Sequence, residues 1–182
     1  MPNEILLKTF TGTPIVFAHG DDFDNSPFAD TEEMDMSGLG IGDSRESPKV
    51  DLGDLLSNNG KLPERIAVLG AFEFADAPTA TGAVHLYWSA SPSAGATDDN
   101  PYLITGSDAE IPTPSSAFLG QLQFIGSVPV QNVADVVFQK TFVTSFPLRY
   151  GSLLVFNDTD QAFEASADKI HVDFYAMVDE GQ

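Results

Sequence analysis

The chain has 182 residues and no cysteine, and its 27 acidic residues against 8 basic ones give a formal net charge of −19. Such a charge disfavours direct binding to nucleic acid or to an anionic membrane, because both need a basic surface. The absence of cysteine excludes disulfides and thiolate metal sites. Hydrophobic residues make up 42%, so one domain with a full-sized core is expected.

The chain begins with two strand-like runs, EILLKTF at residues 4–10 and TPIVFA at residues 13–18. Thr11 and Gly12 lie between them, which predicts a hairpin. Residues 1–19 are therefore assigned to the first strands of the domain. The start, MPNEILLKTF, lacks the basic residues and long apolar run of a signal peptide, so we expect a soluble protein that stays in a cytoplasm or in a particle assembled there.

Residues 20–48 form an acidic segment with no sustained helical or strand period, predicted to be an extended arm or a long loop. Apolar side chains are scattered among its acids: Phe23, Phe28, Met34, Met36 and Leu39. Apolar residues in such a setting are typical of a segment that docks into pockets of a partner. The alternative is a long loop folded over its own domain, and the sequence leaves both open.

Part of this segment has the ligand spacing of an EF-hand calcium loop, with oxygen-bearing side chains at Asp22, Asp24, Ser26, Asp30 and Glu33. The sixth position of such a loop needs glycine, because the chain turns there with positive φ. Pro27 stands at that position, and its ring fixes φ near −65°. An EF-hand is rejected and no cofactor is predicted, although an irregular cation site remains an alternative.

Residues 49–182 complete the domain with short apolar runs broken by Gly, Pro, Asn, Asp and Ser. Residues 50–56 suit a short helix or a strand, and residues 91–116 form a long polar excursion. Strands are predicted at residues 65–74, 82–91, 118–130, 133–148, 151–158 and 169–179. Eight or nine strands and little helix predict an all-β fold, a single β-sandwich that is jelly-roll-like.

The residues that could carry chemistry are few. Three histidines, His19, His85 and His171, show no His-x-His spacing, and no nucleotide-binding or hydrolase motif is present. The many acids always allow a hydrolase pair to be nominated, so they predict nothing specific. Tyr87 and Trp88 are adjacent in one strand, so one faces the core and the other faces outward. With Tyr102 they are the candidate contacts of a carbohydrate-binding module.

Two stretches carry a family resemblance, AVHLYWSASPSAGATDDNPYLITGSD at residues 83–108 and FPLRYGSLLVFNDTDQAF at residues 146–163. With the final strand, this part of the chain resembles virion structural proteins of tailed bacteriophages, of the capsid decoration or cement kind. The resemblance implies a non-enzymatic β-sandwich or jelly roll on the capsid exterior. It also implies the major capsid protein and further copies of itself as partners, for instance as a trimer. The alternative is a carbohydrate- or receptor-binding module of a phage particle.

Overall fold

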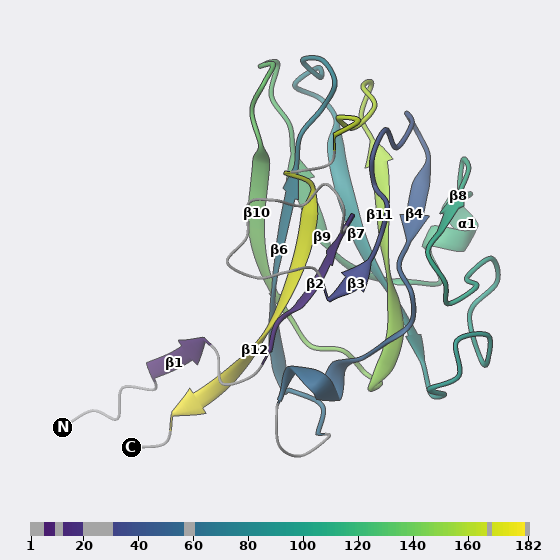
Figure 1. Ribbon diagram of the computed structural model, residues 1–182, viewed down its shortest axis with the longest axis vertical. Coiled ribbons are helices and arrows are strands. Elements are labelled where there is room, and N and C mark those ends of the chain that lie inside the picture. Colours follow the sequence, from purple (N-terminus) through teal and green to yellow (C-terminus); the bar gives the residue numbers. More distant parts are fainter. Residues whose placement is uncertain (1–5, 10–12, 20–30, 57–60, 167–168, 181–182) are drawn as a thin grey trace.

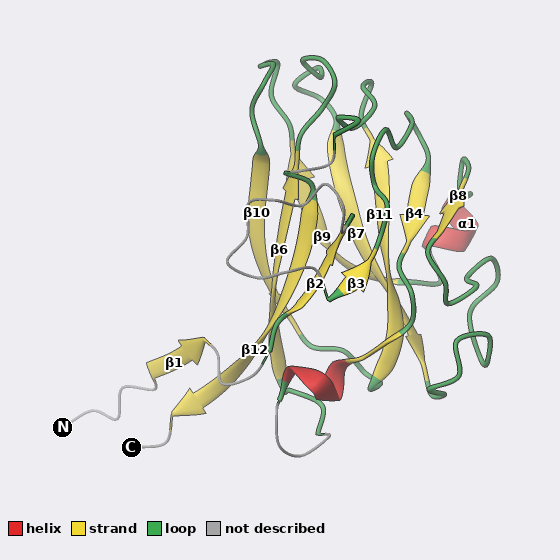
Figure 2. Cartoon of the chain, in the orientation of Figure 1, coloured by secondary structure: helices red, strands yellow, loops and turns green. Residues whose placement is uncertain are grey.

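Short strands make up almost all of the regular structure (Figure 2). A computed structural model describes residues 6–9, 13–19, 31–56, 61–166 and 169–180. In chain order its elements are β1 (Leu6–Thr9), β2 (Ile15–Ala18), β3 (Glu32–Glu33), β4 (Ser44–Glu46), β5 (Val50–Asp51), the 3-10 helix η1 (Leu52–Leu55), β6 (Arg65–Phe72), β7 (Ala83–Ser91), β8 (Ala109–Ile111), α1 (Ser116–Leu119), β9 (Gln123–Pro129), β10 (Phe138–Thr144), β11 (Tyr150–Asp158) and β12 (His171–Glu180). Among the described residues, no helix is long and apolar enough to cross a membrane.

The strands form two sheets that pack face to face, which confirms the predicted β-sandwich (Figure 1). The first sheet has the order β10-β6-β12-β2-β3, with β1 paired to the far end of β12. The second has the order β8-β4-β11-β7-β9, with β5 paired to β11. Because β1 and β2 both pair with β12 and not with each other, the predicted N-terminal hairpin is wrong.

The main antiparallel pairs are nested along the chain. The innermost pair in sequence is β7 with β9. Moving outward along the chain in both directions, the next pairs are β6 with β10, then β4 with β11, and finally β2 with β12. The chain thus resembles one long hairpin, wrapped so that β6 also meets β12 and β7 also meets β11. Nearly every sheet contact therefore joins residues far apart in sequence, which is why strand order is hidden from the sequence pattern.

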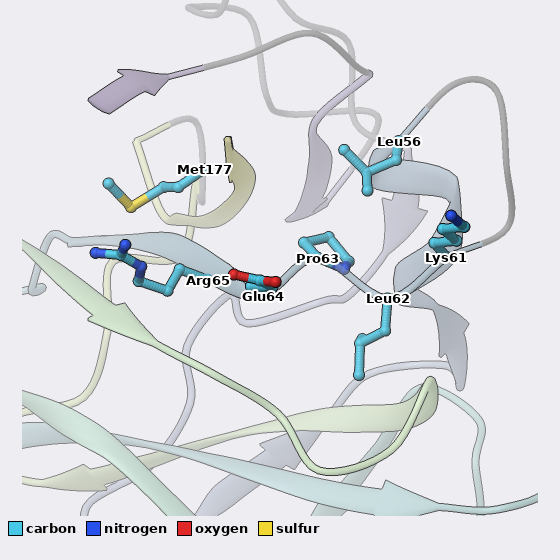
Figure 3. A pocket seen from close by; sticks show the side chains of 7 residues that line it. All are labelled: Leu56, Lys61, Leu62, Pro63, Glu64, Arg65 and Met177. Carbon is cyan, nitrogen blue, oxygen red and sulfur yellow. The ribbon is translucent and has the colours of Figure 1, made fainter. Parts of the chain in front are cut away.

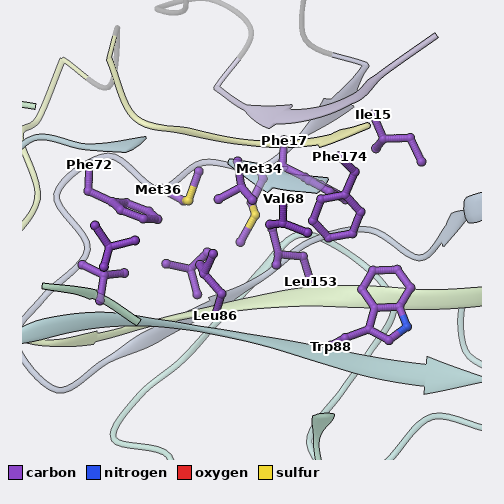
Figure 4. Packing of buried hydrophobic residues seen from close by; sticks show 14 of the residues in the cluster. Ile15, Phe17, Met34, Met36, Val68, Phe72, Leu86, Trp88, Leu153 and Phe174 are labelled. Carbon is purple, nitrogen blue, oxygen red and sulfur yellow. The ribbon is translucent and has the colours of Figure 1, made fainter. Parts of the chain in front are cut away.

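The core lies between the inward faces of the two sheets (Figure 4). On β12, Val172, Phe174 and Ala176 are buried and alternate with outward-facing neighbours, as the period-2 pattern predicts. From the opposite sheet, Trp88 and Leu153 pack against this face, and the Trp88 and Phe174 ring centroids lie 5.7 Å apart. Burial of these large side chains is the main stabilising term of the fold.

The described part of the acidic segment belongs to this core and is not a free arm. Met34, Met36 and Leu39 are fully or almost fully buried among the residues of both sheets. The segment is fixed there because β3 pairs with β2 and β4 pairs with β11. The prediction that these three side chains contact a partner is therefore wrong. Residues 31–48 instead follow the alternative, a segment folded over its own domain, while Phe23 and Phe28 lie outside the described residues.

Candidate functional site: an aromatic face on the second sheet

Four rings gather on the outer face of the second sheet. Along β7, Leu86 and Trp88 point into the core, so His85 and Tyr87 point outward. Phe156 of β11 pairs with His85, and Phe124 of β9 pairs with Tyr87. We call His85, Tyr87, Phe124 and Phe156 the aromatic platform.

A β-bulge places Phe124 on this face. The β7–β9 register shifts between Leu86 and Tyr87, so that Gly126 pairs with Leu86 but Phe124, not Ile125, pairs with Tyr87. Ile125 consequently packs against the core, and Phe124, the residue before it in β9, faces outward. Without the bulge, strict alternation would bury Phe124 and expose Ile125. The local irregularity therefore completes the platform.

The rings of the platform contact one another. The ring centroids of Tyr87 and Phe124 lie 5.4 Å apart, and those of His85 and Phe124 lie 6.1 Å apart. The imidazole stacks on Phe156 at 6.0 Å with an interplanar angle of 25°. Phe124 is 52% exposed, a large fraction for a phenylalanine, so the platform presents an open ring to the solvent.

The imidazole of the platform is held by two polar partners. His85 Nδ1 lies 2.7 Å from Ser127 Oγ, and His85 Nε2 lies 3.2 Å from Asp158 Oδ2. Because an ionised carboxylate only accepts, Nε2–H donates to Asp158, and in the neutral imidazole Nδ1 accepts from Ser127. Burial, followed by the charge of Asp158, raises the pKa of the Tyr87 hydroxyl. The face thus combines apolar rings with a fixed hydrogen-bonding edge.

Ser127, His85 and Asp158 are also the residue types of a hydrolase triad. A triad imidazole passes a proton between nucleophile and leaving group, so substrate must be able to reach it. In the triad template the serine faces Nε2 of the imidazole and a buried carboxylate faces Nδ1. Here Ser127 faces Nδ1, and Asp158, whose side chain is 63% exposed, faces Nε2, so the geometry of the template is not reproduced.

A shallow hollow of about 470 Å³ lies beside the platform. Its lining includes Tyr87 and Phe124 of the platform and Ser116 and Leu119 of α1. The helix begins at Ser115, whose Oγ accepts from Phe118 N, and Phe118 is buried in a second small core on this face of the sheet. That core covers one part of the outer face and packs against Tyr87, whereas Phe124 stays exposed. The strand predicted from residue 118 is thus replaced at its start by a helix.

A second hollow, of about 390 Å³, lies where β6 begins and β12 leaves the body of the sandwich (Figure 3). Its apolar lining includes Leu56, Leu62 and Met177. Lys61 and Arg65 lie at opposite ends of the group in Figure 3, so their charges do not converge on one point. The geometry of this hollow therefore indicates no particular ligand.

The polar loop that follows β7 holds a lysine. Lys49 Nζ donates to Ser91 Oγ at 3.0 Å and to the carbonyl oxygens of Gly95 at 2.7 Å and Asp98 at 2.6 Å. Burial lowers the pKa of Lys49 despite the nearby acids. Within the described ranges, no group of three or more His, Asp or Glu side chains is arranged to hold a metal ion. The ammonium group therefore occupies the place that a loop cation would take.

The three aromatic residues predicted as carbohydrate contacts lie in different environments in the structure. Tyr87 lies in the platform, whereas Trp88 is completely buried in the core and cannot contact a ligand. Tyr102 is 74% exposed in the loop between β7 and β8, but it does not line the hollow. His85, Phe124 and Phe156 were missed as contacts, because only strand order and the bulge bring them together.

No protein-family model matches the chain, and no curated protein matches its sequence.

Proposed function

We propose that the protein is a non-enzymatic structural component of a phage particle, which binds the capsid lattice from outside and stabilises it. Its partners in this proposal are the major capsid protein and neighbouring copies of the chain. We also propose that the sandwich is a jelly roll, because its four nested strand pairs contribute four strands to each of the two six-stranded sheets, and a jelly roll has eight strands in two sheets. Jelly rolls are common in viral capsid proteins and in lectins.

The observation that carries the proposal is a flank with three exposed valines and no net formal charge on a strongly acidic protein. Residues 111–148 contain only two charged residues, Asp135 and Lys140, in a chain whose formal net charge is −19. Val133, Val136 and Val143 are exposed within this span, Val143 by 56%. We call the surface of residues 130–144 the β10 flank. Exposed apolar side chains with little charge around them are typical of a protein-docking surface.

The flank is also rigid enough to serve as a contact surface. It lies where β9 and β10, the end strands of the two sheets, run side by side. Gln123 Nε2 donates to Ser145 O at 2.8 Å, and Lys140 Nζ donates to Ser127 O at 3.2 Å, so side chains of each strand hold the other. A surface that is ordered before binding loses less conformational entropy when it docks.

The negative charge of the rest of the chain supports a position outside a DNA-filled shell. Three of the basic side chains form ion pairs within the chain: Arg45 with Asp108, Arg149 with Asp51, and Lys169 with Glu73. The excess acids therefore dominate the electrostatic field, which repels nucleic acid and favours solubility. Acidic surface around a flank without net charge would also orient the protein as it approaches a basic partner surface.

Co-sedimentation tests this function. Purified protein is mixed with capsids of the same virus that lack it, and the pellet is compared for the wild type and for Val136→Glu and Val143→Glu. We expect the wild type to sediment with the capsids and both variants to remain in the supernatant. Ile41→Glu, on another exposed residue (60%), is the matched control and should sediment like the wild type. A wild-type protein that stays in the supernatant would overturn the proposal.

A second candidate function is a carbohydrate- or receptor-binding module of a phage particle. The specific observation in its favour is the aromatic platform, with its half-exposed phenylalanine and adjoining hollow. The platform and the β10 flank are different surfaces, so one protein could use both.

A further inference from the structure

We propose that the aromatic platform binds a neutral or amino-substituted sugar of a cell-surface glycan. The inference rests on the second candidate function and names its ligand class and its residues. It does not depend on capsid binding, because the β10 flank contributes no residue to it.

The ring geometry matches one face of a pyranose. A sugar ring has a face of C–H groups and an edge of hydroxyls, so it binds where an aromatic face adjoins hydrogen-bonding groups. Phe124 is 52% exposed, and its ring centroid lies 5.4 Å from that of Tyr87. The two rings are inclined by 59°, so the exposed ring of Phe124 is the surface on which the C–H face would stack, with Tyr87 beside it.

The hollow beside these rings supplies space. Its volume of about 470 Å³ lies within the roughly 300–1,000 Å³ of small-molecule sites. It is shallow and open on one side, which suits a short oligosaccharide that continues into solvent better than a small molecule enclosed on all sides. Ser116 is the hydroxyl-bearing residue of its lining besides Tyr87.

Asp158 lies outside the hollow and borders the platform at His85, where it provides a polar edge. Its side chain is 63% exposed, and one carboxylate oxygen already accepts from His85 Nε2, which fixes its position. The other oxygen and the free lone pairs can accept from sugar hydroxyls or from the ammonium group of an amino sugar. Positioned acceptors of this kind give specificity without large conformational change.

Charge selects among glycans. The carboxylate of Asp158 borders the platform, and the whole chain carries −19. Sialylated and sulfated sugars are therefore repelled, whereas neutral sugars are tolerated and amino sugars are attracted. A protein ligand is less suited to this face, because a stable protein interface buries about 800 Å² on each side. Here α1 and the second small core cover the adjoining part of the sheet.

The test is a glycan array of neutral, amino-substituted, sialylated and sulfated oligosaccharides, followed by NMR titration of the free protein with the best binder. We expect binding confined to the first two classes. Phe124→Ala should weaken it at least ten-fold, while Tyr87→Phe, which keeps the ring, should retain it. Asp158→Asn should keep neutral sugars but lose the preference for amino sugars.

Tyr102→Ala is the matched control, since it removes an even more exposed aromatic ring outside the hollow and should leave affinity unchanged. Failure of every glycan to bind would overturn the inference, as would equal loss in Phe124→Ala and Tyr102→Ala. Unchanged thermal unfolding shows that each variant is folded. Capsid co-sedimentation of Phe124→Ala should match the wild type, so failure here is separable from failure of capsid binding.

Discussion

Met36→Ala tests whether the acidic segment is core or arm. The Met36 side chain is completely buried, and Figure 4 shows it beside Phe72, on the side of the core away from Trp88. Truncation of a buried methionine to alanine leaves a cavity and destabilises by about 2–5 kcal/mol. For a chain of this length each kcal/mol lowers the melting temperature by about 2–4 °C, so a fall of about 4–20 °C is expected.

Thermal unfolding followed by circular dichroism measures this shift, and sedimentation velocity on the same samples reports the oligomeric state. Ile41→Ala is the matched control, because Ile41 lies in the same segment but is 60% exposed. An exposed site away from special features changes stability by at most about 0.5 kcal/mol, so this control should stay within about 2 °C of the wild type. If Met36→Ala melted like the control yet lost self-association, the segment would be a docking arm and its assignment to the core would be refuted.

Three further predictions follow from single residues. Gly106 has φ +73°, and an added Cβ would collide with the Ala96 carbonyl oxygen, so Gly106→Ala should lower the melting temperature measured by differential scanning fluorimetry. Desolvation raises the pKa of the buried Glu46 carboxyl above 4.5, so Glu46→Gln should be more stable than the wild type at pH 7. Urea titrations should show that the difference in unfolding free energy between the two proteins shrinks as the pH falls through the raised pKa. The hydrogen bond from Arg149 lowers the pKa of Asp51 below 3.8. The stability that this pair contributes is therefore present above pH 3.8 and is lost as the pH falls through the lowered pKa. Urea titrations of the wild type should show this loss, and those of Asp51→Asn should not.

The sequence predicted the parts of the fold that depend on local alternation. In β12, Val172, Phe174 and Ala176 are buried where the period-2 pattern placed them. The same rule predicted that Tyr87 and Trp88 face opposite sides of their strand, and they do. Burial of one face of a strand depends on the alternation of apolar and polar residues along that strand. It can therefore be predicted without knowing which strands lie beside it.

The parts that depend on distant residues were not predictable. Met34 and Met36 show no period, because an irregular segment fixed by short pairings at each end carries them into the core. The platform could not be predicted from the sequence for another reason. It combines three strands, and a bulge reverses the facing of Phe124, so neither pattern nor spacing indicates it.

Cryo-electron microscopy of capsids assembled with and without the protein tests the central proposal most directly. The account predicts additional density on the capsid exterior, into which the β-sandwich fits with Val136 and Val143 of the β10 flank against the lattice. The aromatic platform should then remain open to solvent. Absence of that density from saturated capsids, or a fit in which the β10 flank faces away from the shell, would contradict it.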